Sequence, residues 1–157
     1  MTNGFPEVEG SNLEGQKLTL PYDLAGKLNI VIIAFKRYQQ RLVDDWIPSL
    51  EKLTQMYPEI EFYEVPTLAK GYLLMRFIID GGMRSGIPSR QARERTITIY
   101  INKRQFKEKL DISSENTIYL FLVTTDGKIL RQEEGAMTEA KIRKLQNQIK
   151  EYLNQNK

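Results

Sequence analysis

The 157-residue chain contains no cysteine and no histidine, and these two absences exclude several kinds of chemistry at once. Without cysteine the chain forms no disulfide, offers no thiol nucleophile and provides no zinc–thiolate site. Without histidine it lacks the usual general base at neutral pH and the commonest metal ligand. Ser-His-Asp and Cys-His catalysis are therefore excluded, and we expect no catalytic residue, no cofactor and no metal.

Long hydrophobic runs are also missing. The longest apolar stretches, Leu28 to Phe35 and Tyr72 to Ile79, are too short to cross a bilayer, so we expect no membrane insertion. The first residues, Met1 to Pro6, have neither the basic nor the apolar region of a signal peptide, which predicts a cytoplasmic protein. No repeat or Pro/Gly/Ser-rich linker divides the chain, so we expect a single domain over residues 1–157.

Positive charge is concentrated in one segment. The whole chain carries a net charge of +3, with a pI near 9.0. Arg84 to Lys109 holds eight cations against two carboxylates, a net +6, which leaves −3 for the remainder. We expect residues 84–112 to form a basic insertion that contains an additional strand.

The hydrophobic pattern predicts alternating strands and helices. Leu28 to Phe35 is a nearly continuous apolar run, typical of a central strand that is buried on both faces. Further strands are expected at 17–20, 60–65, 96–101, 117–123 and 128–130, with a hairpin turn at 126–127. Helices are expected at 40–56, at 69–80 with an end at 81–82, and at 138–153. This order predicts an α/β fold, a three-layer α/β/α sandwich with a mixed central sheet.

Several strings and spacings in this order resemble the redoxin branch of the thioredoxin-like superfamily. They are Phe5 to Val8, Leu13 to Leu20, Gly26 with Lys27, Phe35 with Pro48 thirteen residues later, and Asp126 with Gly127 followed by Gly135. The resemblance covers nearly the whole chain. It implies that the sandwich is thioredoxin-like and that residues 1–26 form an N-terminal lead-in.

The redox site of that superfamily is missing here. Counted from Phe35, its two cysteines would fall at Gln40 and Val43, and the proline that faces them would fall near Thr117 or Ile118. Because thiol–disulfide exchange needs an attacking thiolate, thiol oxidoreductase and peroxidase activity are excluded. We therefore expect Gln40, Val43 and Thr117 to be vestigial active-site positions in a protein that is not an enzyme.

Within the superfamily, the chain is similar to the family of mitochondrial ATP synthase assembly factors, whose thioredoxin-like domain is degenerate. The residues that carry this similarity are Arg84 to Pro88, Ile118 to Val123, Asp126 to Ile129, and Gly135 with Thr138 and Glu139. The similarity implies a chaperone-like role in assembling a complex. It leaves the identity of the protein partner and the oligomeric state open.

Two binding surfaces are sequence-based hypotheses. The turn before residue 40 is expected at a helix N-terminus, where cations and free N–H groups favour an anion. A groove for a peptide or anion would be lined by Arg37, Tyr38, Gln40, Arg41, Arg84, Asn116 and Thr117, unless this surface is degenerate and binds nothing. The alternative is a polyanion or nucleic-acid patch of Arg90, Arg93, Arg95, Lys103, Arg104 and Lys107, for which a solvated charged segment is the simpler explanation.

Two further features have structural explanations. Gly81 to Gly86 fits the spacing of the first part of a phosphate loop, but Ile87 and Pro88 follow where lysine and serine or threonine are required. A helix end and a turn are expected there instead. Trp46 lies on the apolar stripe of the helix at 40–56 and is expected in the core.

Overall fold

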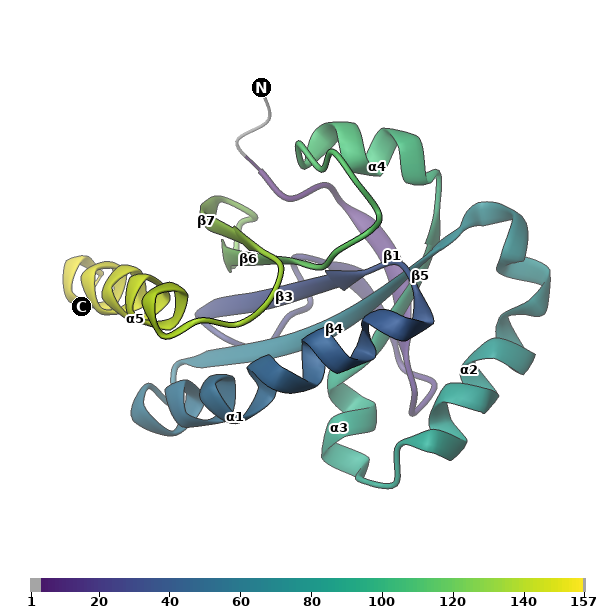
Figure 1. Ribbon diagram of the computed structural model, residues 1–157, viewed down its shortest axis with the longest axis horizontal. Helices are drawn as coiled ribbons and strands as arrows, with labels where there is room; N and C mark the ends of the chain where they lie inside the picture. Colours follow the sequence, from purple (N-terminus) through teal and green to yellow (C-terminus); the bar gives the residue numbers. More distant parts are fainter. Residues whose placement is uncertain (1–3, 157) are drawn as a thin grey trace.

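The computed structural model describes residues 4–156 as a seven-stranded sheet with helices on both faces (Figure 1). The strands are β1 (Val8–Asn12), β2 (Lys17–Leu20), β3 (Leu28–Ala34), β4 (Ile60–Ala69), β5 (Ile97–Ile101), β6 (Tyr119–Thr124) and β7 (Ile129–Glu134). The α-helices are α1 (Gln40–Met56), α2 (Arg76–Gly86), α3 (Arg90–Arg95), α4 (Lys103–Lys109) and α5 (Glu139–Gln155). Two 3-10 turns, η1 (Arg37–Gln39) and η2 (Lys70–Met75), precede α1 and α2. Residues 1–3 of the predicted lead-in, and residue 157, lie outside the described part of the chain.

The sheet has the strand order β2-β1-β5-β4-β3-β6-β7. Strands β3, β4 and β5 run parallel to one another. The remaining strands, β1 and β2 at one edge and β6 and β7 at the other, are antiparallel to their neighbours. This arrangement confirms the predicted mixed sheet between two helical layers.

The two faces of the sheet bury separate hydrophobic cores, because successive side chains of a strand point to opposite faces. On one face, Ile30 and Ile32 of β3 pack with the apolar stripes of α1 and α5. On the other face, Val31 and Ile33 pack with the buried side of α4. Figure 1 shows α4 above the sheet and α1 and α3 below it. Trp46 of α1 is fully buried, as the sequence predicted.

The helix expected at 69–80 is replaced by a strand end, a turn and a later helix. β4 continues to Ala69 because residues 67–69 pair with β5. α2 begins only at Arg76 and runs to Gly86, so the predicted helix end at Gly81 and Gly82 is wrong. A glycine opposes helix formation by only about 1 kcal/mol, which the rest of the helix can offset.

Three elements, β1, α3 and α4, were not expected from the sequence. Both short helices begin at side-chain caps: Ser89 Oγ accepts from the Ala92 N–H at 3.3 Å, and Asn102 Oδ1 accepts from the Gln105 N–H at 3.1 Å. β1 pairs with both β2 and β5. The strand expected at 96–101 therefore lies inside the sheet, between β1 and β4, and is not an exposed edge.

Candidate functional site

The vestigial site predicted from the sequence lies where β3 ends and α1 begins. Gln40 is the first residue of α1, and its exposed amide nitrogen donates to Asp44 and Glu64 at 2.9 and 3.0 Å. Val43 faces the core and is only 2% exposed. Of the two positions where cysteines would stand, only Gln40 therefore faces solvent.

Gln39, which was not predicted as a site residue, organises this turn. Its side chain is buried, and its Oε1 accepts from the backbone N–H groups of Phe35 and Lys36 at 2.8 and 3.1 Å. Its Nε2 donates to the carbonyl oxygen of Glu115 at 2.6 Å, across 76 residues of sequence. Gln39 thus ties the end of β3 to the segment before β6. No sequence signal separates it from its neighbour Gln40, since only the backbone geometry decides which of the two points inward.

Glu115 lies beside this turn among three lysines. Its carboxylate oxygens lie 2.7 Å from the Nζ atoms of Lys103 and Lys107 and 3.6 Å from that of Lys36. Burial alone would raise the pKa of Glu115, but the hydrogen bonds and charges of Lys103 and Lys107 outweigh it and lower the pKa to about 2. Glu115 is therefore ionised at neutral pH, and the cluster carries more positive than negative charge.

The pKa of Glu64, whose carboxyl group accepts the hydrogen bond from Gln40, is shifted in the opposite direction to that of Glu115. Desolvation by burial raises the pKa of Glu64, the hydrogen bond from Gln40 opposes that rise, and the nearby Asp44 adds to it. The chain has no thiol or imidazole for this carboxyl group to activate.

The structure brings most of the predicted groove residues to this turn. Tyr38 is 67% exposed on η1, between the exposed Arg37 and Gln40, and Arg41 is exposed on the first turn of α1. The exposed Asn116 and the half-buried Thr117 directly follow Glu115 on the segment that Gln39 ties to the same turn.

Arg84, the remaining groove residue, lies elsewhere. It is on α2, and its guanidinium contacts the carboxylate of Glu14 and the carbonyl oxygen of Leu13, each at 3.3 Å. These two residues follow β1, which is separated from β6 by three strands of the sheet. Neighbouring strands lie about 4.8 Å apart, so roughly 19 Å separates β1 from β6. Arg84 therefore does not form a second wall with Asn116 and Thr117.

The cations of the predicted polyanion patch do not form one surface. Those of α3 contact Glu14, Glu94 or the ring of Phe62, and those of α4 contact carboxylates on their own side of the sheet. α3 and α4 lie on opposite faces of the sheet (Figure 1). The contacts are Arg90 with Glu94 at 3.0 Å and with Glu14 at 3.9 Å, Arg93 with Glu14 at 3.2 Å, Arg95 over Phe62 at 4.3 Å, Lys103 and Lys107 with Glu115 at 2.7 Å, and Arg104 with Glu108 at 3.5 Å. This division leaves no continuous track for a nucleic-acid backbone.

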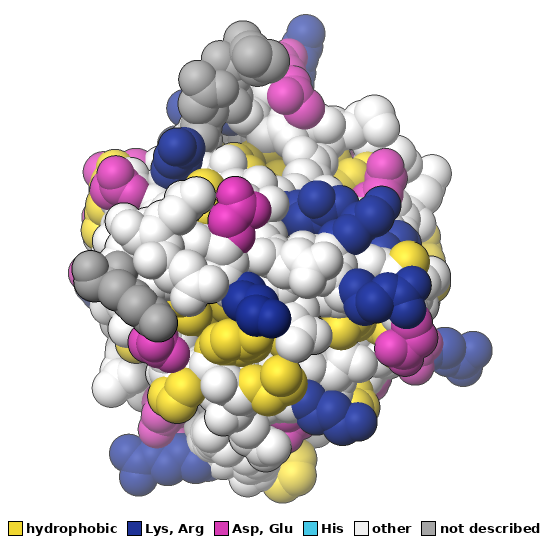
Figure 2. Space-filling view, turned by 90° about the vertical axis from the view of Figure 1, so that its left-hand side faces the viewer, with side chains coloured by type: hydrophobic (Ala, Val, Ile, Leu, Met, Phe, Trp, Pro, Cys, Tyr) yellow, Lys and Arg dark blue, Asp and Glu magenta, His cyan; other side chains and the backbone are white. Residues whose placement is uncertain are grey.

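The most unusual surface lies on η2 and α2. Six large hydrophobic side chains of this segment are exposed, by 45% to 97%: Tyr72, Leu73, Leu74, Met75, Phe77 and Ile78. We call them the 72–78 surface. No side chain of η2 or α2, both of which the structure describes in full, is buried. By contrast, the side with α5 shows cations, carboxylates and small hydrophobic areas interspersed (Figure 2). Exposed apolar clusters of this kind mark binding sites.

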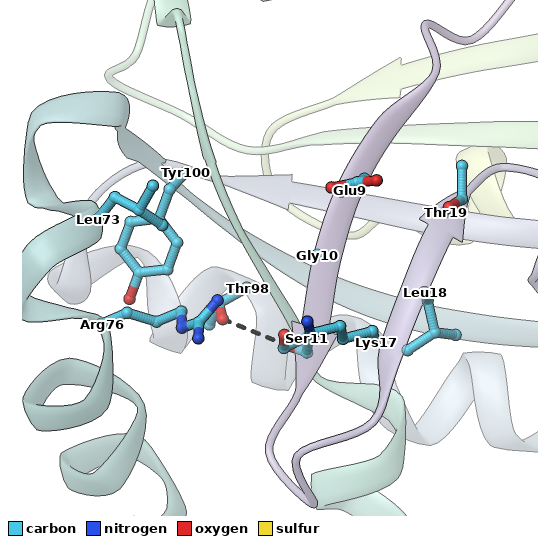
Figure 3. A pocket seen from close by; sticks show the side chains of 10 residues that line it. All are labelled: Glu9, Gly10, Ser11, Lys17, Leu18, Thr19, Leu73, Arg76, Thr98 and Tyr100. Atoms are coloured by element: carbon cyan, nitrogen blue, oxygen red, sulfur yellow. Dashed lines mark hydrogen bonds between the residues drawn. The ribbon is translucent and has the colours of Figure 1, made fainter.

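A groove separates this segment from the β1–β2 hairpin. Its larger cavity measures about 360 Å³, and Figure 3 shows Leu73 and Arg76 on one side, the strands that carry Ser11 and Lys17 on the other, and the ring of Tyr100 beside Leu73. A second cavity of about 230 Å³ continues along α2, and Ser11, Lys17 and Arg76 line both. We call the two cavities together the hairpin groove.

Asp80 connects α2 to β5 beside this groove. Its carboxylate accepts from the hydroxyl groups of Thr98 and Tyr100 of β5, at 3.0 and 2.9 Å. Desolvation and the bond to Asp80 raise the pKa of Tyr100, so its hydroxyl group stays a donor at neutral pH. α2 is thus held by polar contacts, without buried apolar side chains.

Two further features bear on the chemistry of the molecule. Within residues 4–156, no group of three or more His, Cys, Asp or Glu side chains is placed to hold a metal ion. Over the same residues, every helix is too short or too polar to span a bilayer.

The fold and the thiol-free turn define a thioredoxin-like protein without redox cysteines. One similar solved structure is BsSco, a member of the Sco family of cytochrome c oxidase assembly proteins, with 13% sequence identity and a TM-score of 0.66 over 96% of this chain and 94% of that one. Another is yeast Sco1 with copper bound, with 12% identity and a TM-score of 0.61 over 96% of this chain and 94% of that one. The thioredoxin domain of a thiol-disulfide oxidoreductase from Bacteroides vulgatus is also similar, with 19% identity and a TM-score of 0.59 over 97% of each chain.

The family is given by a match over nearly the whole sequence. The model of the ATP10 protein family matches residues 2–152, and the chain belongs to that family. This match confirms the resemblance to ATP synthase assembly factors. Among curated proteins, none matches the chain.

Proposed function

We propose that this protein is a non-enzymatic assembly factor that binds a protein client during the assembly of ATP synthase. The observation that carries the proposal is the match of residues 2–152 to the ATP10 family. Proteins of similar fold include assembly proteins of another respiratory complex, the Sco family named above. Assembly requires binding a partner, and binding needs no catalytic residue.

The absence of thiols supports a role without redox chemistry. A thioredoxin-like protein exchanges disulfides through a thiolate, and this chain has none to offer. Gln40 and Val43 stand where thiols would be needed, one bound to two carboxylates and the other in the core. We infer that the turn serves structure and binding.

The turn at η1 is the first surface to test as the client site. Tyr38 is exposed there, and Arg37 and Arg41 supply positive charge beside the start of α1. The polyanion alternative is less supported, because its cations are divided between two faces and occupied by carboxylates or a ring.

The experiment is affinity capture from a native lysate, treated with nuclease, washed at high salt and read by mass spectrometry. We expect subunits of ATP synthase to survive both washes. Nucleic-acid-associated proteins that vanish on these washes would instead favour the polyanion alternative, whose affinity falls steeply with salt.

The same capture tests the surface with two matched double variants. Tyr38→Ala with Arg41→Ala should lose the client if the η1 turn binds it. Met56→Ala with Arg143→Ala removes a comparable exposed hydrophobic side chain and a cation elsewhere and should retain the client. Client capture by both variants would show that the η1 turn is not the site.

The cytoplasmic location stays a prediction, and cell fractionation tests it.

A further inference from the structure

The hairpin groove and the 72–78 surface form one continuous site with an apolar wall. Leu73 lines the larger cavity and Phe77 the second, and both are strongly exposed, by 45% and 81%. Leu74 and Ile78 extend the apolar area outward, with exposures of 97% and 73%. A soluble chain rarely leaves so many neighbouring apolar side chains in water unless a partner covers them.

The charge of the groove indicates the sign of its ligand. Lys17 and Arg76 line both cavities, and within residues 4–156 no carboxylate lies within ion-pair distance of either one. Arg76 instead lies over the ring of Phe77, at 4.9 Å. Two carboxylates, Glu9 and Asp80, also belong to the lining, but neither pairs with these cations, and Asp80 accepts from two hydroxyl groups. Lys17 and Arg76 are therefore two unpaired cations, each able to pair with a carboxylate of a ligand.

The shape and floor of the groove indicate the kind of molecule. The floor is formed by side chains of β1, β2 and β5 and includes the hydroxyl groups of Ser11 and Thr19, whereas the hydroxyl group of Thr98 is bonded to Asp80 (Figure 3). The larger cavity alone has the size of a small-ligand pocket, but a second one continues it along α2. Two adjoining cavities with hydrogen-bonding floors and an apolar wall fit an extended chain with alternating side chains better than lipid tails, which cannot use the hydroxyl groups.

We propose that the hairpin groove binds an extended segment of a client protein, in which apolar side chains alternate with carboxylates. The apolar side chains pack on Leu73 and Phe77, and the carboxylates pair with Lys17 and Arg76. This proposal rests on the proposed function, because it names a second surface, separate from the η1 turn, and the chemistry through which the assembly factor would hold its client.

The first test uses defined peptides and the full chain. A fluorescein-labelled peptide of twelve alternating glutamate and leucine residues should bind saturably in fluorescence anisotropy. Peptides that alternate lysine with leucine, or glutamate with serine, should bind at least about tenfold more weakly, because each loses half of the complementary chemistry. No binding of the glutamate–leucine peptide up to about 1 mM, or equal binding of all three, would overturn the proposal.

Variants locate the binding on the molecule. Leu73→Asp with Phe77→Asp, and separately Arg76→Glu, should each weaken the glutamate–leucine peptide by about tenfold or more. Met56→Asp places a carboxylate at a site of similar exposure on α1 and should bind like the unchanged chain. Circular dichroism checks that each variant is folded, which we expect because none of these side chains is buried. Equal affinities for all variants would refute the location.

Vesicles distinguish a membrane from a protein segment. Vesicles of anionic phosphatidylglycerol that bind through Leu73 and Phe77, with no binding of the peptide, would replace the proposed occupant by a lipid surface.

In the client capture, loss of the client with Leu73→Asp and Phe77→Asp supports the groove. Capture that survives this double variant overturns the groove and leaves the assembly function standing, whereas absence of any client from the unchanged chain overturns the function itself.

Discussion

Replacing Gln39 by alanine should destabilise the fold strongly, although the side chain is polar and lies at a turn. The substitution leaves the N–H groups of Phe35 and Lys36 and the carbonyl oxygen of Glu115 without their partner. Each buried polar group that loses its partner costs about 1–3 kcal/mol, and water can reach part of this turn. We therefore expect Gln39→Ala to lower the free energy of unfolding by about 2–4 kcal/mol, a large share of a typical 5–15 kcal/mol.

Gln40→Ala is the matched control, one residue further along the chain. Its side chain is exposed, and it loses two surface hydrogen bonds while gaining the better helix former. We expect a change below about 1 kcal/mol. Urea unfolding can be followed through Trp46, which is the one tryptophan of the chain and is buried. With an m-value near 2 kcal/mol/M, Gln39→Ala should shift the midpoint by about 1–2 M. A shift no larger than that of Gln40→Ala would refute the role of Gln39 as the tie between β3 and β6.

Three further substitutions test other contacts. Glu115→Gln should lower the free energy of unfolding by about 1 kcal/mol at pH 7, a small value because solvent screens the partly exposed lysines. The urea midpoints of this variant and of the unchanged chain should converge as the pH falls. Because the pKa of Glu115 is lowered from 4.5 to about 2 in the folded chain, ionised Glu115 stabilises the fold above pH 4.5, and this contribution is lost as the pH falls through about 2. A difference between the two urea midpoints that is as large at pH 2 as at pH 7 would contradict this. Asp80→Ala should speed hydrogen exchange in residues 76–86 while leaving the urea midpoint nearly unchanged, because α2 buries no side chain. Gly10→Ala should cost about 1–3 kcal/mol, since its Cβ would lie 2.8 Å from side chains and a carbonyl oxygen of β5, whereas Gly71→Ala, with nothing within 4 Å, should change the midpoint little.

The central strand and the first helix could be predicted because their patterns are long. The apolar run from Leu28 predicts β3 to within one residue, and the helical spacing predicts the bounds of α1 as Gln40–Met56. β1 and α3 could not be predicted in this way, since each has only five or six residues and few apolar ones. Such short elements form because their neighbours and caps hold them, which a linear pattern does not contain.

The arrangement around Gln40 could be predicted only in part, for a related reason. Spacing from Phe35 places Gln40 at the start of α1, but it does not show that Gln39 is the buried partner of Glu115. Arg84 was assigned to the same groove, yet strand order places it beside the hairpin. The apolar run that includes Phe77 predicts a helix, but the pattern does not show that the side chain of Phe77 is left exposed. Tertiary contacts decide each of these points.

Deletion of the gene in its native host, followed by native electrophoresis of ATP synthase, tests the proposed role in assembly. We predict that the amount of assembled ATP synthase falls on deletion and returns when the cysteine-free chain is expressed again. Assembled complex at an unchanged level after deletion would contradict this role.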